Sequence, residues 1–148
     1  MASRKPQKCE FAESRLIWRF QKVLPARVEA ISPVVEHVLK QTKEMGCSPG
    51  KELAIETALR EALANAIIHG CQGNPNLEIQ VCVGCDPEKG ILIVVKNPGA
   101  GFDPSLIPNP TRGENIFVSH GRGIFLINQL MDEVQFKNQG TEIHMRKR

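Results

Sequence analysis

A carboxylate and a carboxamide stand four residues apart at Glu61 and Asn65, which places them on one face of any helix that contains both. The carbonyl oxygen of Asn65 is a hard, neutral ligand that can complete a magnesium shell made mainly of phosphate oxygens and water. Glu61 can accept a proton from an incoming hydroxyl group. The same spacing is also typical of a solvated helix face, so this pair by itself leaves both interpretations open.

Two pairs of glycines add to this picture. Gly99 and Gly101 follow an apolar run, and Gly121 and Gly123 precede another. Glycine lets the backbone approach a ring or a phosphate closely, and the N–H groups at the start of a helix can receive phosphate. Each pair alone could be an ordinary turn, with Arg122 simply exposed. Together with the helix face, the pairs indicate a nucleotide site assembled from three separated segments.

The elements that must position these segments are predicted from apolar periodicity and turn residues. Ser32-Pro33 and Ser48-Pro49 are read as helix start signals, with serine as the N-cap and proline in the first turn. We expect strands over about 15–24, 77–83, 90–96, 133–137 and 141–146, and helices over about 33–45, 51–69 and 124–131. This order predicts an α+β fold, a two-layer α/β sandwich in which helices cover one face of a mixed, mostly antiparallel sheet.

The second predicted helix has two distinct faces. Its buried stripe is expected to comprise Leu59, Ala62, Leu63, Ala66 and Ile67. Glu61, Asn65 and His69 follow one another a turn apart along a different face, which is free for chemistry. The segment 98–123 is rich in proline, glycine and asparagine, and a loop of that length in a small domain is usually functional or mobile.

Length and composition limit the possible classes of protein. The chain has 148 residues, and we expect a flexible tail over 1–12 and a single domain over 13–148. The net charge of +3 comes without a basic stripe, which argues against direct nucleic-acid binding. No apolar run approaches a membrane span and no secretory signal is evident, so we expect a cytoplasmic protein that does not bind membranes. The 5 cysteines are then expected to be reduced.

The motifs carry a resemblance to a known family. Glu61-x-x-x-Asn65 resembles the N box of the GHKL (histidine-kinase-like) ATPase superfamily, in the form found in anti-sigma-factor serine/threonine kinases. The segments 99–104 and 121–134 resemble the two glycine boxes of that family, and 140–145 resembles its final strand. The resemblance runs from about residue 15 to the C-terminus, and the four motifs in the family's order make it specific.

The resemblance implies a Bergerat-type pocket for ATP and Mg²⁺, with a flexible lid over about 104–120. It implies that Glu61 is catalytic and that Asn65 is the metal ligand. It also implies transfer of the γ-phosphoryl group to an anti-anti-sigma (STAS-domain) protein, binding of a sigma factor, and homodimers. The residues that it assigns to cofactor binding are Asn65, His69, Asn97, Gly99, Gly101, Phe102, Gly121, Arg122, Gly123, Ile124 and Thr141.

Asn97 departs from the family pattern. The first glycine box usually begins with an aspartate that accepts a hydrogen bond from the adenine amino group. Asparagine keeps one acceptor oxygen but loses the charge, and charge-assisted hydrogen bonds are about twice as strong as neutral ones. Its amide can also donate, which relaxes discrimination against guanine. Two functions therefore stay open: an ATP-dependent serine/threonine protein kinase, and a switch that binds nucleotide and partners without phosphoryl transfer.

Overall fold

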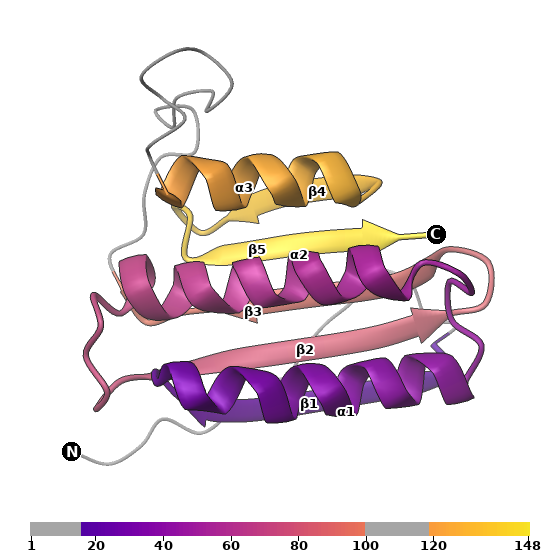
Figure 1. Ribbon diagram of the computed structural model, residues 1–148, viewed down its shortest axis with the longest axis horizontal. Helices are drawn as coiled ribbons and strands as arrows, with labels where there is room; N and C mark the ends of the chain where they lie inside the picture. Colours follow the sequence, from indigo (N-terminus) through magenta and orange to yellow (C-terminus); the bar gives the residue numbers. More distant parts are fainter. Residues whose placement is uncertain (1–15, 100–118) are drawn as a thin grey trace.

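The computed structural model describes residues 16–99 and 119–148 (Figure 1). Its elements follow in the order β1 (Trp18–Pro25), the 3-10 turn η1 (Val28–Ala30), α1 (Ile31–Glu44), α2 (Glu52–Asn65), the π-helical turn η2 (Ala66–Gly70), β2 (Glu78–Asp86), β3 (Gly90–Lys96), α3 (Ser119–Leu130), β4 (Glu133–Lys137) and β5 (Glu142–Lys147).

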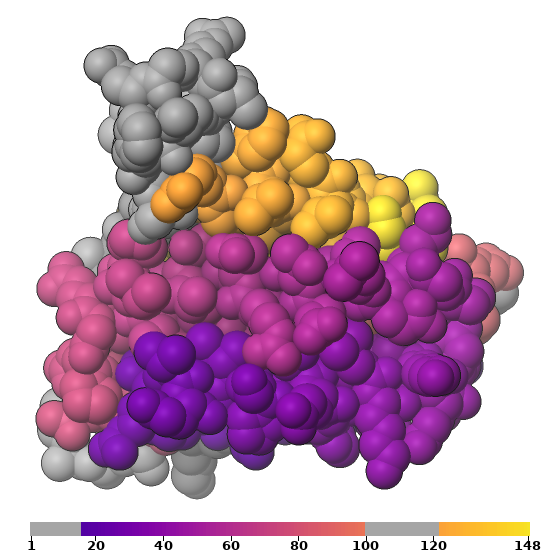
Figure 2. Space-filling view, in the orientation of Figure 1, coloured from indigo at the N-terminus to yellow at the C-terminus, as the bar shows by residue number. Residues whose placement is uncertain are grey.

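The strands form one sheet in the order β1-β2-β3-β5-β4, and the helices cover one of its faces (Figures 1 and 2). The predicted α+β sandwich is confirmed. The expected mixed character is wrong for the described strands, because every neighbouring pair is antiparallel. The reason lies in the connections: β5 lies between β3 and β4, so these two parallel strands never become neighbours.

The core lies between the sheet and the helices. Alternate residues of β2 and β3 face it, and the stripe predicted from periodicity is buried throughout, along α2 and into η2. Leu59 and Leu63 are fully buried there. The polar residues Glu61 and Asn65 stay partly accessible on the same helix. One side of α2 therefore packs into the core, and another side keeps its polar groups accessible.

The serine–proline start signals were interpreted wrongly. Helix α1 begins at Ile31 with Ala30 as its cap, one residue before Ser32. Helix α2 begins at Glu52 with Lys51 as its cap. The Ser48 hydroxyl instead donates to the Lys147 carbonyl at 2.5 Å and accepts the Ile91 N–H at 3.2 Å. Tertiary contacts of Ser48 with the sheet therefore replace the local cap.

The prediction of reduced cysteines is wrong for three of the described cysteines, because Cys47, Cys82 and Cys85 are disulfide-bonded. Cys47, which follows α1, forms a disulfide with Cys85 near the end of β2, and their Cα atoms lie 6.1 Å apart. The sequence places these residues 38 positions apart, and only the packing of α1 over the sheet, with its end beside the end of β2, brings them within bridging range (Figure 1). Cys71 is a free, buried thiol. In the described ranges, no helix is long and apolar enough to cross a bilayer.

Candidate functional site

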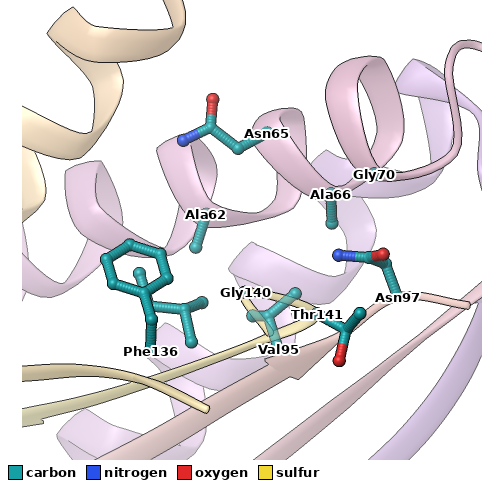
Figure 3. Close-up of a pocket in the computed structure, with 10 residues that line it drawn as sticks. Ala62, Asn65, Ala66, Gly70, Val95, Asn97, Phe136, Gly140 and Thr141 are labelled. Carbon is teal, nitrogen blue, oxygen red and sulfur yellow. The ribbon is translucent and has the colours of Figure 1, made fainter. Parts of the chain in front are cut away.

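A hollow lies where α2 and η2 pass over the ends of β3 and β5 (Figure 3). It measures about 340 Å³ including its open side. Its enclosed cavity has a volume of only about 30 Å³, so a purine base would have to push its walls apart. Its walls are mostly small or apolar, with three amide or hydroxyl side chains among them: Ala62, Asn65, Ala66, Gly70, Val95, Asn97, Phe136, Gly140, Thr141 and Ile143.

Asn97 is held at the end of β3 by two hydrogen bonds. Its backbone N–H donates to the Thr141 carbonyl at 2.9 Å, which joins the end of β3 to the start of β5. Its side-chain Oδ1 accepts the Gly99 N–H at 2.9 Å, closing an Asx turn. Thr141 is itself fixed, because its hydroxyl donates to the Asn138 carbonyl at 2.8 Å. Asn97 and Thr141, 44 positions apart in the sequence, thus lie side by side in the hollow.

Two glycines allow η2 to lie directly on this turn. A Cβ added to Gly70 would lie 2.5 Å from Asn97 Cγ. A Cβ added to Gly99 would lie 1.9 Å from the Gly70 carbonyl oxygen. Gly70 was absent from the predicted site, because the sequence marks it only as the end of a helix. The π-helical turn that carries it is a further signal, since such turns are frequent at functional sites.

We expect Gly99→Ala to weaken nucleotide binding by about 10–100-fold. The added methyl group must push the turn that holds Asn97 away from Gly70, and overpacking of this kind costs ~1–3 kcal/mol. Titration calorimetry with ADP measures the change. Gly46→Ala is the matched control, because its φ of 68° makes alanine strained while its Cβ would meet nothing within 4 Å. An ADP affinity unchanged by Gly99→Ala would contradict this role of the turn.

Helix α3 brings the second glycine box against α2. A Cβ on Gly123 would lie 2.8 Å from Glu61 Oε2, and 3.3 Å from both terminal atoms of the Asn65 side chain. Any side chain at Gly123 would therefore require the Glu61 carboxylate to move away from α3. Figures 1 and 2 show α3 running alongside α2.

The glycine pair was expected to precede its helix, and this is wrong. Helix α3 begins at Ser119, so Gly121 and Gly123 belong to its first turns, and His120, the last residue of the predicted lid, is helical. Ile124 is buried and Arg122 is exposed. Ile124, Ile127 and Met131 are all buried, as helical spacing predicts. The helix itself begins five residues before Ile124, the first residue of this buried pattern.

The remaining predicted residues have different outcomes. His69 lies in η2 and is not among the residues that line the hollow, and partial burial lowers its pKa. Gly101, Phe102 and the predicted lid over 104–118 lie outside the described residues. The apolar walls Ala62, Ala66, Val95, Phe136 and Ile143 were not predicted as site residues, since periodicity marks such residues only as core.

The side-chain oxygens of Glu61 and Asn65, which lie together against Gly123, are suitable ligands for a metal. Among the residues that the structure describes, no group of three or more His, Cys, Asp or Glu side chains gathers as a cage. Mg²⁺ commonly uses one or two protein oxygens and completes its shell with phosphates and water. The donor set therefore fits a magnesium ion that arrives with a nucleotide.

Comparison with known protein families identifies the family of this domain. A family model described as the histidine kinase-like ATPase domain matches residues 24–147. The match spans the helices, strands β2 to β5 and the residues that line the hollow, so the chain contains a histidine kinase-like ATPase domain.

Individual relatives narrow the class. The serine-protein kinase RsbW of Oceanobacillus iheyensis is 30% identical over 131 residues, covering 84% of this chain and 82% of that protein. The anti-sigma F factor of Bacillus cytotoxicus is 32% identical over 99 residues, covering 63% of this chain and 66% of the relative. A Staphylococcus aureus RsbW is 38% identical over 97 residues, or 61% of each chain. The chain belongs to the anti-sigma-factor kinase family within this class.

Proposed function

We propose that the chain is an ATP-dependent serine/threonine protein kinase of the anti-sigma-factor type. The observation that carries the proposal is the position of Gly123, whose Cβ would contact Glu61 and Asn65 at once. The Glu61 carboxylate, the Asn65 amide, whose oxygen is a suitable ligand for Mg²⁺, and the first turns of α3 thus lie together beside a mostly apolar hollow. Relatives named serine-protein kinase RsbW support the same activity.

In this proposal the base occupies the hollow between α2 and the ends of β3 and β5. Asn97 meets its polar edge, and Ala62, Val95 and Phe136 form apolar walls around it. The phosphates lie toward the first turn of α3, where unpaired N–H groups and the positive end of the helix dipole favour anions. Asn65 is the protein ligand of Mg²⁺, which would neutralise charge on the β- and γ-phosphates.

Glu61 then faces the hydroxyl group of the protein substrate. The hydroxyl oxygen forms a bond to the γ-phosphorus while the bond from that phosphorus to the β–γ bridging oxygen breaks. The hydroxyl proton passes to the Glu61 carboxylate. Because phosphoryl transfer needs little covalent help, most of the rate enhancement comes from positioning and charge neutralisation.

The partners form part of the same proposal. The substrate is a serine or threonine of an anti-anti-sigma STAS-domain protein, and the second ligand is a sigma factor, in keeping with the relative named anti-sigma F factor. A homodimer and a cytoplasmic location are also proposed. Binding to nucleic acid or to a membrane is not part of the function.

A second candidate is a switch that binds nucleotide and partners without transferring phosphate. Asn97 favours it, because an uncharged amide stands where the family carries a carboxylate. The Glu61–Asn65 pair favours the kinase, since a pure binding protein has no use for a proton acceptor beside the phosphates.

The deciding experiment is incubation of the purified chain with Mg-ATP and candidate STAS-domain proteins, followed by intact mass measurement. We expect one STAS protein to gain the mass of a single phosphoryl group, and only in the presence of Mg²⁺. Nucleotide and partner binding without any mass gain would reject the kinase and support the switch.

A further inference from the structure

The side-chain amide of Asn97 has a defined orientation. The Gly99 N–H lies 2.9 Å from Oδ1 of Asn97. A backbone N–H can only donate, so the amide oxygen and not the nitrogen must face it. A flipped amide would set donor against donor and lose this bond.

The amide nitrogen therefore faces the hollow. Figure 3 shows Nδ2 on the side of Ala66 and the middle of the hollow, and Oδ1 on the opposite side. In the described part of the chain, the bond to Gly99 is the one hydrogen bond of the Asn97 side chain. Asn97 thus offers a donor to whatever enters the hollow. An aspartate in the same turn would offer a second acceptor.

The position of the phosphate-binding groups determines which edge of a base would meet this donor. Asn65 projects from α2 away from Asn97 (Figure 3) and lies with Glu61 against Gly123 of α3. A purine with its sugar and phosphates on that side turns the opposite edge, positions 1 and 6, toward Asn97. Adenine carries an amino group at position 6, whereas guanine and hypoxanthine carry an acceptor oxygen there.

We propose that Asn97 sets the base preference of this site, so that 6-oxopurine nucleotides bind at least as tightly as their adenine counterparts. The inference rests on the proposed nucleotide site and extends its phosphoryl donors from ATP to GTP-type nucleotides. Adenine can still enter by sliding until its N1 acceptor meets Nδ2. A 6-oxopurine needs no such shift, because its oxygen already faces the amide.

The test compares ADP with inosine diphosphate (IDP). Adenine has an amino group at position 6 and no proton on N1, whereas hypoxanthine has an oxygen at position 6 and a proton on N1. Calorimetry on the parent chain is expected to give an IDP affinity equal to or above that for ADP. Asn97→Asp keeps the acceptor for Gly99 and presents a second acceptor to the base. It should shift the ratio of the two affinities toward ADP by about tenfold or more, the scale of one mismatched buried hydrogen bond.

Asn74→Asp is the matched control. Asn74 closes a similar exposed turn, with its Oδ1 accepting the Asn76 N–H at 3.0 Å, and it is not among the residues lining the hollow. It adds the same charge and should leave the ratio unchanged. Thermal unfolding of each variant verifies that it is folded.

The outcomes separate this inference from the proposed function. A parent chain that binds ADP more than about tenfold tighter than IDP, or a ratio that Asn97→Asp leaves unchanged, would overturn the inference and leave the kinase proposal standing. A folded parent chain that binds neither nucleotide would reject the nucleotide site itself, and the inference with it.

Discussion

Replacing Glu61 by glutamine is expected to slow phosphoryl transfer to a STAS-domain partner by ~10²–10⁴-fold, the usual cost of losing a general base. Glutamine matches the shape of the carboxylate but cannot take the hydroxyl proton. Affinity for ADP should change little, because Glu61 is not among the residues that line the hollow where the base is proposed to bind. Single-turnover transfer, measured beside calorimetry with ADP, separates the two quantities.

The same helix offers a matched control for Glu61. Glu56 pairs with Arg60 at 3.2 Å on the surface of α2, one turn and a residue before Glu61. Glu56→Gln removes an equal charge at the cost of a surface ion pair worth about 0–1 kcal/mol, and it should transfer phosphate at the parent rate. Equal transfer by the parent and Glu61→Gln would make Glu61 a helix-surface residue.

Replacing Leu63 by alanine is expected to lower the free energy of unfolding by ~2–5 kcal/mol. Leu63 is 0% exposed and belongs to the main core cluster under α2. Removing its side chain leaves a cavity that the neighbouring helices and strands fill only in part. Chemical denaturation followed by circular dichroism measures the change.

Leu53→Ala on the same helix provides the comparison for Leu63. Leu53 is 77% exposed, so its truncation should change stability by less than about 0.5 kcal/mol. A loss below ~1 kcal/mol for Leu63→Ala would contradict the assignment of this stripe to the core. Both variants replace a leucine by alanine on α2. The difference between their losses in the free energy of unfolding therefore measures the effect of burial.

Local patterns were sufficient for most of the fold. The apolar stripe of α2, the continuous apolar run of β3 and the closing hairpin each carry their own periodicity, and each appears where it was predicted. Predictions failed where a distant contact outweighed a local signal. Ser48 is the clearest example, because its hydroxyl bonds Ile91 and Lys147 of the sheet and caps no helix. Cys47 is another, since its disulfide partner lies on β2.

For the candidate site, the sequence by itself determined the chemical types: Glu61 and Asn65 on one helix, the paired glycines, and the amide of Asn97 at the end of a strand. Those are properties of residue identity and spacing, which a linear chain displays directly. Only the tertiary structure decided that Asn97 lies against Gly70 and Thr141, and that Gly123 contacts the Glu61–Asn65 face. It also decided which atom of the Asn97 amide faces the hollow, because that depends on the hydrogen bond to Gly99. Contacts of this kind arise from packing between segments far apart in the chain, and no local pattern encodes them.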